Sequence, residues 1–297
     1  MTDFASHLRG LRRSETTVRD YTGDVELYST WHQARHGVPA DVTTINRVDV
    51  NEWLREQSEA DVAPATMNRR LASLKAWVNW GQETGQIDER HNPLARVHGF
   101  KVQKVGPRWL QRTDQGRLAR TVELRLHQQG EWTRDQRLAD AAMIALMRYT
   151  GLRAGEVVAL RIGDLNISQD GKRGTVVVRH GKGDKRREVP LHSKECIPQL
   201  QAWLEARPAS ENDQLFVGKR GPLSYAGLYR RLRGLTAMAD VDCTPHQLRH
   251  TAAKELINAG AQLSEVQAIL GHERIETTIR YTTPDAIDLA RAMERMS

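Results

Sequence analysis

Apolar residues recur at spacings of three and four through the first hundred residues, the spacing that gathers side chains on one face of an α-helix. The repeat is clearest in Val18, Tyr21, Val25, Tyr28 and Trp31. Ser14 precedes this stripe and is a good residue type for capping the start of a helix. Further helices are predicted at Val48–Glu56 and at Pro64–Trp80, with Gly81 and Gly85 ending the latter. We therefore expect this part of the chain to be helical.

The helical spacing is lost at His98–Pro107, where two glycines and a proline fall close together. This composition is typical of a link between domains, and a chain of 297 residues is long enough for two. We predict a helical domain at residues 1–100, a linker at residues 101–107 and a second domain at residues 108–297.

The second domain shows helical patterns on both sides of a short β-meander. Helices are predicted at Gln136–Thr150 and at Pro245–Asn258, with Gly260 ending the second. The three strands of the meander are expected at Leu160–Ile167, Thr175–His180 and Arg187–Leu191. Gly181 and Gly183 fall between the last two strands, as a hairpin loop requires. The expected fold class is mainly α, with a small antiparallel β-sheet in the C-terminal domain.

Positive charge is concentrated in the second part of the chain. The formal charge is +7, but residues 1–100 sum to −2 and the remainder to +9. Basic residues are densest in residues 101–120 and 172–187, each of which contains a single acidic residue. Such clusters suit a polyanion such as DNA, and a solvated basic surface is an equally good interpretation of charge alone. The same two interpretations apply to Asn68, Arg69 and Lys75 on the polar side of the third predicted helix.

Several classes of protein are disfavoured by composition. The longest mainly apolar stretch, Ala139–Met147, is too short to cross a membrane. The first ten residues lack the basic-then-apolar layout of a signal peptide, so we expect a cytoplasmic protein. Cys196 and Cys243 are the only cysteines, which indicates neither a disulfide framework nor a zinc-ligand cluster.

Six polar residues of the second domain are not explained by local structure. They are Arg153 after an apolar helix, Lys182 in the hairpin, His246 and Arg249 three apart on one helix, His272 after a helix-ending glycine, and Tyr281. Taken singly, each has a plain structural interpretation: a local ion pair of Arg153 with Glu156, a solvated lysine, helix-capping residues, or a half-buried tyrosine. Their order and spacing as a set are much harder to explain in that way.

The segments TGLRAGE, HGKGDKRREVPL, HQLRHT, LGHE and TTIRYT, between Thr150 and Thr282, resemble the tyrosine recombinase family, which includes phage integrases and Xer recombinases. The resemblance implies a helical SAM-like core-binding domain that contacts DNA, followed by a tyrosine recombinase catalytic domain. It covers nearly the whole chain, and the combined set of motifs is highly specific.

The resemblance also implies a role for each motif residue. Arg153 and Arg249 match the two catalytic arginines, Lys182 matches the hairpin lysine, and His246 and His272 match the active-site histidines. Tyr281 matches the nucleophile. The supporting positions are Glu156 and His250. The residues expected to contact DNA are Arg69, Lys75, Lys101, Lys104, Arg108, Lys185 and Arg186.

The physical chemistry of these residue types agrees with such roles. A tyrosine with an ordinary pKa of about 10 is neutral near pH 7 and needs a base or a positive field to become a nucleophile. Two guanidiniums can supply that field while binding phosphate oxygens in bidentate fashion. A lysine on a loop can protonate the departing 5′ oxygen, and histidines can hold or move protons near neutrality. This chemistry requires no metal or other cofactor.

The family further implies a 3′-phosphotyrosyl intermediate and strand exchange in a tetramer on two double-stranded DNA recombination sites. A free protein that is a monomer or dimer, and accessory proteins, are left open, as is the choice among integration, excision and resolution. The apolar residues Ile287, Leu289, Ala290 and Met293 have helical spacing. They are expected to dock either on a neighbouring subunit or on the subunit to which they belong.

Three other functions explain part of the pattern. A non-enzymatic DNA-binding regulator would account for residues 261–281, which resemble a helix–turn–helix. It leaves Arg153 and Lys182 without a role. A type IB topoisomerase-like enzyme would share the chemistry, but the two-domain layout and His272 favour a recombinase. A metal-dependent nuclease or transposase would need a carboxylate cluster that is not evident in the sequence.

Overall fold

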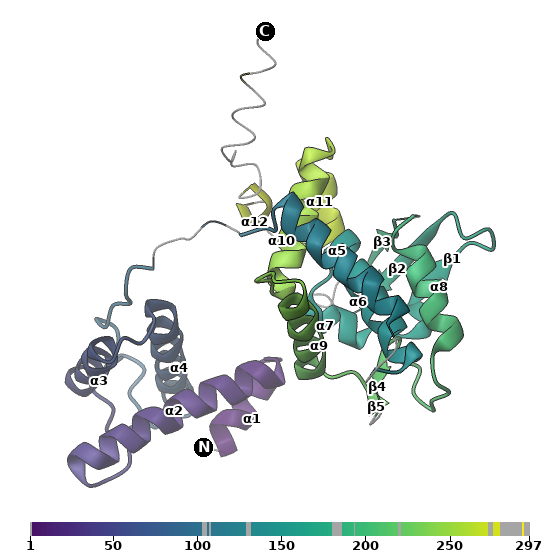
Figure 1. The fold of residues 1–297 in the computed structure, drawn as a ribbon. Coiled ribbons are helices and arrows are strands. Elements are labelled where there is room, and N and C mark those ends of the chain that lie inside the picture. The colour runs from purple at the N-terminus through teal and green to yellow at the C-terminus, as the bar shows by residue number, and fades with distance from the viewer. Residues whose placement is uncertain are drawn as a thin grey trace. The chain divides into compact units, whose positions relative to one another are not determined.

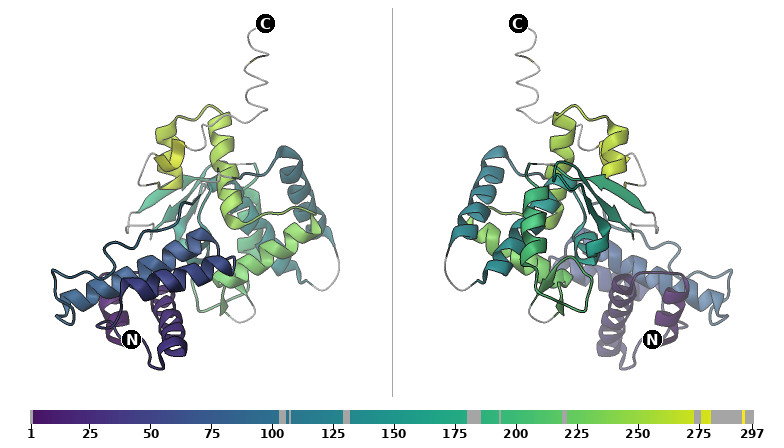
Figure 2. Two further views of the ribbon diagram at one scale, coloured as in Figure 1. Left: turned by 90° about the vertical axis from the view of Figure 1, so that its left-hand side faces the viewer. Right: turned by 90° about the vertical axis from the view of Figure 1, so that its right-hand side faces the viewer.

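The chain folds into two compact units, residues 1–105 and 106–297 (Figure 1). The computed structural model describes residues 2–102, 106, 108–128, 132–179, 186–192, 194–218, 221–272, 276–279 and 293. All described strands belong to the second unit, and the described part of the first unit is helical. Figure 2 shows the same division from two further sides.

The first unit contains four helices, α1 (Thr2–Gly10), α2 (Glu15–His36), α3 (Arg47–Glu59) and α4 (Pro64–Glu83). The long helices α2 and α4 pack against each other, and α1 and α3 pack against both. Their apolar faces form one core around the fully buried side chains of Phe4, Tyr28, Met67 and Leu74. The predicted helical character of this region is confirmed, and α1 is an element that the sequence analysis did not identify.

The ends of these helices follow local sequence chemistry. The side chain of Ser14 accepts a hydrogen bond of 3.1 Å from the backbone of Thr17, so the predicted cap of α2 is confirmed. The helix predicted at Pro64–Trp80 is α4. The prediction that it ends at Gly81 is wrong, because α4 continues to Glu83. Gly81 is buried against Val42 and Ile87, and a side chain there would collide with Val42. Its missing side chain therefore lets α4 pack closely against Val42 and Ile87, which lie outside the helix.

The second unit is built around α6 (Arg134–Thr150). The side chains of α6 are buried almost without interruption from Ala139 to Met147, because α5, α8 and α10 pack around this helix. The other helices of the unit are α5 (Arg112–His127), α7 (Ala154–Ala159), α8 (Ile197–Ala206), α9 (Tyr225–Met238), α10 (Pro245–Asn258), α11 (Leu263–Leu270) and α12 (Glu276–Ile279). The apolar stretch that the sequence showed is thus a core helix.

A three-stranded antiparallel sheet lies beside these helices, in the order β1 (Leu165–Ile167), β2 (Gly174–Val178) and β3 (Arg187–Pro190). A second, two-stranded sheet pairs β4 (Val217–Gly218) with β5 (Gly221–Pro222). The antiparallel meander with its hairpin between β2 and β3 is as predicted.

The predicted first strand, Leu160–Ile167, is wrong in its first half. Residues Ile162–Asp164 form a 3₁₀ turn, and only the last three residues pair with β2. The first half forms backbone hydrogen bonds elsewhere. The carbonyl of Leu160 accepts one of 2.7 Å from the backbone nitrogen of Leu215, and the backbone nitrogen of Ile162 donates one of 2.7 Å to the carbonyl of Asp213. The chain before β1 is therefore paired with the segment after α8, which is distant in sequence.

The structure also bears on membrane spans and on the two cysteines. No helix in the described part of the chain is long and apolar enough to cross a membrane. Cys196 and Cys243 are both buried free cysteines, and burial raises the pKa of each thiol to about 12. A thiol with so high a pKa is a poor nucleophile and a poor metal ligand at neutral pH.

Candidate active site

The end of α6 turns sharply and delivers Arg153 to the surface. Gly151 caps the helix in the left-handed conformation, with φ of 64°. A side chain at Gly151 would also lie 2.5 Å from the side chain of Leu270, so α11 approaches this turn closely. Arg153 then occupies the N-cap position of the short helix α7, with its side chain 35% exposed.

Arg249 reaches the same turn from α10. Its side chain is buried, with the residue only 2% exposed. One terminal nitrogen donates to the carbonyl of Gly151 and the other to the carbonyl of Leu270, both at 2.7 Å. These two bonds fix the plane of the guanidinium between the ends of α6 and α11.

The C-terminal end of α11 is a shared acceptor for three arginines. Arg249 binds the carbonyl of Leu270, Arg153 binds that of Gly271 at 3.3 Å, and Arg187 binds that of Ile269 at 3.1 Å. The last carbonyls of a helix lack partners within the helix and carry a partial negative charge, so they favour cations. Gly271, with φ of 65°, ends α11 where a side chain would collide with Arg187.

Glu156 holds two of these arginines together. It accepts a 2.9 Å bond from the side chain of Arg153 and a 2.8 Å bond from the backbone nitrogen of that residue. On its other side, Arg187 donates two parallel bonds of 3.0 and 2.8 Å to the two carboxylate oxygens. The predicted pairing of Arg153 with Glu156 is present, and it belongs to a larger network.

Arg187 was not among the candidate site residues that the sequence suggested. It lies at the first position of β3, within the basic run 172–187, and the run gave no reason to separate it from its neighbours. The structure distinguishes them: the side chain of Arg187 is 12% exposed, whereas that of Arg186 is 69% exposed. Only the fold brings Glu156 and β3 together.

The ionisation of Glu156 reflects a contest between burial and its cationic partners. Burial is the largest single influence and raises the pKa of the carboxyl group. The bonds from Arg187 and from the backbone of Arg153, together with both positive charges, outweigh it and leave the pKa below the usual value for glutamate. The stabilisation from this network is therefore present at neutral pH and is lost as the pH falls through the folded-state pKa.

His272 lies directly after the cap of α11, and it is buried. Its ring nitrogen Nδ1 lies 2.9 Å from the hydroxyl of Thr278, a fully buried residue of α12. This contact connects α12 to the end of α11. Thr278 is a second residue of the site that the sequence analysis did not suggest.

His246 and His250 lie on α10, one turn apart, and flank Arg249 in sequence. Their rings meet edge to face with centroids 4.1 Å apart. His246 is exposed and His250 is buried, so the pair extends from the solvent-exposed side of α10 to its buried side. The catalytic role expected for His246 and the supporting role expected for His250 stay predictions.

Two of the six predicted catalytic residues, Lys182 and Tyr281, lie outside the described residues. In sequence, Lys182 lies in the connection between β2 and β3, and Tyr281 follows α12. Of the residues expected to contact DNA, Lys104 and Lys185 also lie outside the described part of the chain. These four assignments stay predictions, as do the roles expected of the other site residues.

The other residues expected to contact DNA are spread over both units. Arg69 pairs with the buried carboxylate of Asp24, and Lys75 donates a 2.8 Å bond to the carbonyl of Val97. Both therefore have partners inside the first unit. Lys101 and Arg108 are exposed, and so is Arg186, which pairs with Glu188 at 3.1 Å.

Asn68 exchanges two hydrogen bonds with the backbone of Phe100, at 2.9 and 2.7 Å. With the bond from Lys75, these contacts fasten the segment Val97–Phe100 along α4. The polar side of this helix thus has a structural role in addition to any contact with DNA.

The arrangement in the second unit can bind a tetrahedral oxyanion. Two guanidiniums, from Arg153 and Arg249, are set by the ends of α6 and α11, and a buried carboxylate fixes the orientation of one of them. Groups that are held in place before a reaction lose little free energy to reorganisation when charge develops. This favours chemistry at a phosphate group.

Comparison with known proteins identifies relatives over nearly the whole chain. Residues 121–286 match the family described as "Phage integrase family", and residues 1–83 match "Phage integrase, N-terminal SAM-like domain". A tyrosine recombinase XerC of Corynebacterium efficiens is 36% identical over 274 residues, which cover 91% of this chain and 81% of the relative. A tyrosine recombinase XerD of Listeria monocytogenes is 29% identical over 283 residues, covering 92% and 89%.

Solved structures share the fold. The XerH site-specific recombinase bound to palindromic difH substrate, in a post-cleavage complex, has a TM-score of 0.75 at 22% identity; the match covers 97% of this chain and 84% of that one. A lambda integrase (75-356) dimer bound to a COC' core site has a TM-score of 0.68 at 17% identity, covering 94% and 93%.

Replacing Arg187 by Met should reveal the strength of the Glu156 network. The variant leaves a buried carboxylate with one guanidinium, so we expect it to lower the free energy of unfolding at pH 7 by about 3 kcal/mol. Because Glu156 becomes protonated in acid, the difference from the unaltered protein should shrink as the pH falls through the lowered folded-state pKa of this carboxyl group. Denaturant unfolding across a pH series measures both effects.

The neighbouring substitution Arg186→Met is the matched control. It removes an exposed ion pair with Glu188, so its effect should stay below about 1 kcal/mol. Equal effects of the two substitutions at pH 7 would contradict a special role for Arg187.

Proposed function

The chain belongs to the phage integrase family of tyrosine site-specific recombinases, and we propose that it cuts and rejoins double-stranded DNA through a covalent bond between Tyr281 and a 3′ phosphate. The observation that carries this proposal is the pair of guanidiniums of Arg153 and Arg249, both held by the carbonyl end of α11. The catalytic domain is residues 108–297, and the helical domain, residues 1–100, grips DNA. The reaction takes place in the cytoplasm.

Each site residue has a defined part in the proposed reaction. Arg153 and Arg249 bind the non-bridging oxygens of the phosphate and stabilise the charge that develops at phosphorus. Tyr281 attacks the phosphorus, and the bond to the 5′ oxygen breaks. Lys182 gives that oxygen its proton, while His246 and His272 hold or move protons. The 5′ hydroxyl of a partner strand then attacks the phosphotyrosine, which releases the tyrosine and joins the strands.

The contact between His272 and Thr278 supports the assignment of the nucleophile. Thr278 is fastened to the site by this contact, and Tyr281 is three residues farther along the chain. Three residues span at most about 11 Å of backbone, so chain connectivity keeps position 281 in the neighbourhood of Thr278. This connectivity supports the assignment of Tyr281 as the nucleophile that acts on a phosphate bound by the arginines.

A DNA substrate that carries a nick beside the scissile phosphate tests the covalent step. The unaltered protein should form a covalent adduct that survives denaturation and needs no added metal. Tyr281→Phe should abolish the adduct and keep DNA binding, because only the hydroxyl is removed. If Tyr281→Phe still forms the adduct, or the unaltered protein forms none on a verified cognate site, the proposal is wrong.

Arg249→Lys tests the role of the guanidinium. A single ammonium cannot bridge the carbonyls of Gly151 and Leu270 and also bind phosphate as a fork, so the cleavage rate should fall by roughly 100-fold or more. Arg207→Lys is the matched control. Arg207 also bridges two carbonyls, those of Asn212 and Gln214, at 2.8 Å each. It lies outside the site, so cleavage should persist in this variant.

The proposed active assembly is a tetramer on two DNA sites. A groove of about 380 Å³ lies between α5 and α6, lined by apolar side chains such as Leu118, Val122 and Ile144. We place the C-terminal segment of a neighbouring copy in this groove. That segment has apolar residues at helical spacing, and its described residue Met293 is 68% exposed.

Deletion of residues 286–297 tests this mode of assembly. The shortened protein should still bind a single half-site, but it should lose cooperative assembly on paired sites, because the groove is left without its occupant. Gel-shift titration with half-sites and full sites separates the two effects. Unchanged cooperativity would show that the segment docks on its own subunit or has no role in assembly.

A further inference from the structure

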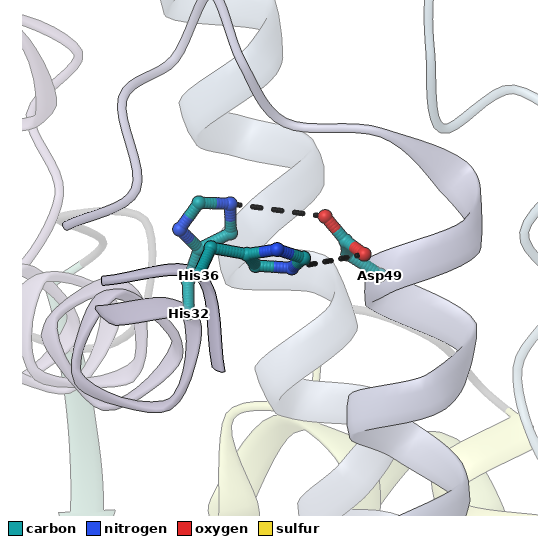
Figure 3. A group of neighbouring side chains, drawn as sticks. All are labelled: His32, His36 and Asp49. Carbon is teal, nitrogen blue, oxygen red and sulfur yellow. Dashed lines mark ion pairs between the residues drawn. The ribbon is translucent and has the colours of Figure 1, made fainter. Parts of the chain in front are cut away.

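Three side chains with nitrogen and oxygen ligand atoms converge in the first unit, far in sequence from the candidate active site. His32 and His36 lie one turn apart at the end of α2, and Asp49 lies in the first turn of α3 (Figure 3). The Nε2 atom of His36 is 3.3 Å from one carboxylate oxygen of Asp49, and that of His32 is 3.7 Å from the other. One ligand atom from each of the three residues lies within 4.8 Å of the others.

These separations suit a shared metal ion. Zinc binds histidine nitrogen and carboxylate oxygen at about 2.0–2.1 Å in tetrahedral geometry, which places neighbouring ligand atoms about 3.3 Å apart. The two nitrogen–oxygen separations are equal to or slightly longer than that value. Small rotations of the side chains would bring all three atoms around one ion.

The surroundings orient the ligand atoms as a metal site requires. The Nδ1 atom of His32 lies 2.9 Å from the carbonyl of Val38, so it donates its hydrogen there and leaves Nε2 as the lone-pair nitrogen. The side-chain nitrogen of Asn46 donates a 2.8 Å bond to Asp49. A histidine bound to a backbone carbonyl and a carboxylate bound to an amide are the outer contacts that typically hold metal ligands in place.

Ion pairing alone is a weaker explanation of the cluster. With Nδ1 of His32 donating to Val38, its Nε2 has a hydrogen for Asp49 only when the ring is charged. Such an ion pair would be buried, because His32 is only 6% exposed and Asp49 only 9%, and desolvating both charges offsets much of their attraction. A divalent cation satisfies the lone pairs of two neutral rings and the charge of the carboxylate together.

One more polar group beside the cluster lacks a partner. The hydroxyl of Tyr28, one turn before His32, is buried and makes no hydrogen bond among the described residues. The ring of Tyr28 lies 6.1 Å from the ring of His32, centroid to centroid. A water molecule bound to a metal at this position would offer the hydroxyl a partner.

We propose that His32, His36 and Asp49 bind one divalent transition-metal ion, with zinc the best match, and leave a fourth position for water. Nitrogen ligands select against Mg²⁺ and Ca²⁺, which prefer all-oxygen sites. His36, with a side chain 39% exposed, gives the ion a path from solvent. The ion connects the end of α2 to the start of α3 and so closes the loop of residues 37–46.

Zinc titration of the full-length, tag-free protein after treatment with a chelator tests the site. A competing chromogenic chelator should report one equivalent bound with a dissociation constant of about 1 μM or tighter. His36→Gln should weaken binding by about 100-fold or more, as should Asp49→Asn. Zinc should also raise the melting temperature of the unaltered protein and leave that of His36→Gln unchanged.

His98→Gln is the matched control, because His98 is an exposed histidine of the same unit outside the cluster. It should keep full zinc affinity. Circular dichroism of each metal-free variant establishes that it is folded. An unaltered protein that binds no zinc would overturn the proposal. So would zinc binding that His36→Gln or Asp49→Asn leaves intact, or that His98→Gln weakens equally.

Discussion

The attraction between arginine side chains and the carbonyl end of α11 organises the candidate active site. Arg249, Arg153 and Arg187 come from three different elements, and each donates to a carbonyl of residues 269–271. Without these bonds the carbonyls would be unsatisfied at a helix end, and the guanidiniums would lack fixed orientations. Glu156 completes the arrangement by binding Arg153 and Arg187 from the other side. The placement of these arginines therefore depends on helix termini as much as on charge.

The same contacts separate the functions that the sequence left open. In a DNA-binding helix–turn–helix, α11 and the residues after it would be the recognition element. Here the carbonyls at the end of α11 accept hydrogen bonds from three arginines, and α12 is fastened to this end through Thr278 and His272. A helix–turn–helix regulator would leave this cluster of arginines unexplained. The family models that match the chain are those of recombinases, in line with our proposal that Arg153 and Arg249 bind a scissile phosphate.

Some parts of the fold were readable from local sequence and others were not. Helix α10 was predicted with its end at Asn258 because proline marks the start of a helix and Gly260 marks its end. The strand predicted at Leu160 was wrong over its first half because those residues bond to the chain near Leu215, a pairing that no local pattern encodes. Arg187 was indistinguishable from Arg186 until β3 was placed beside α7 and α11. The histidines of α2 gain significance only from Asp49, which approaches across a loop.

The sequence by itself determined the helical first domain, the meander with its hairpin, the family and the residues that stand at the motif positions. These depend on periodicity, on capping residues and on motif spacing, which are properties of neighbouring residues. Only the tertiary structure decided that Arg249 is buried between two helix ends, that Arg187 shares Glu156 with Arg153, and that two histidines face Asp49. The physical reason is that burial and hydrogen-bond partners depend on which distant segments meet, and that is set by the packing of the whole core.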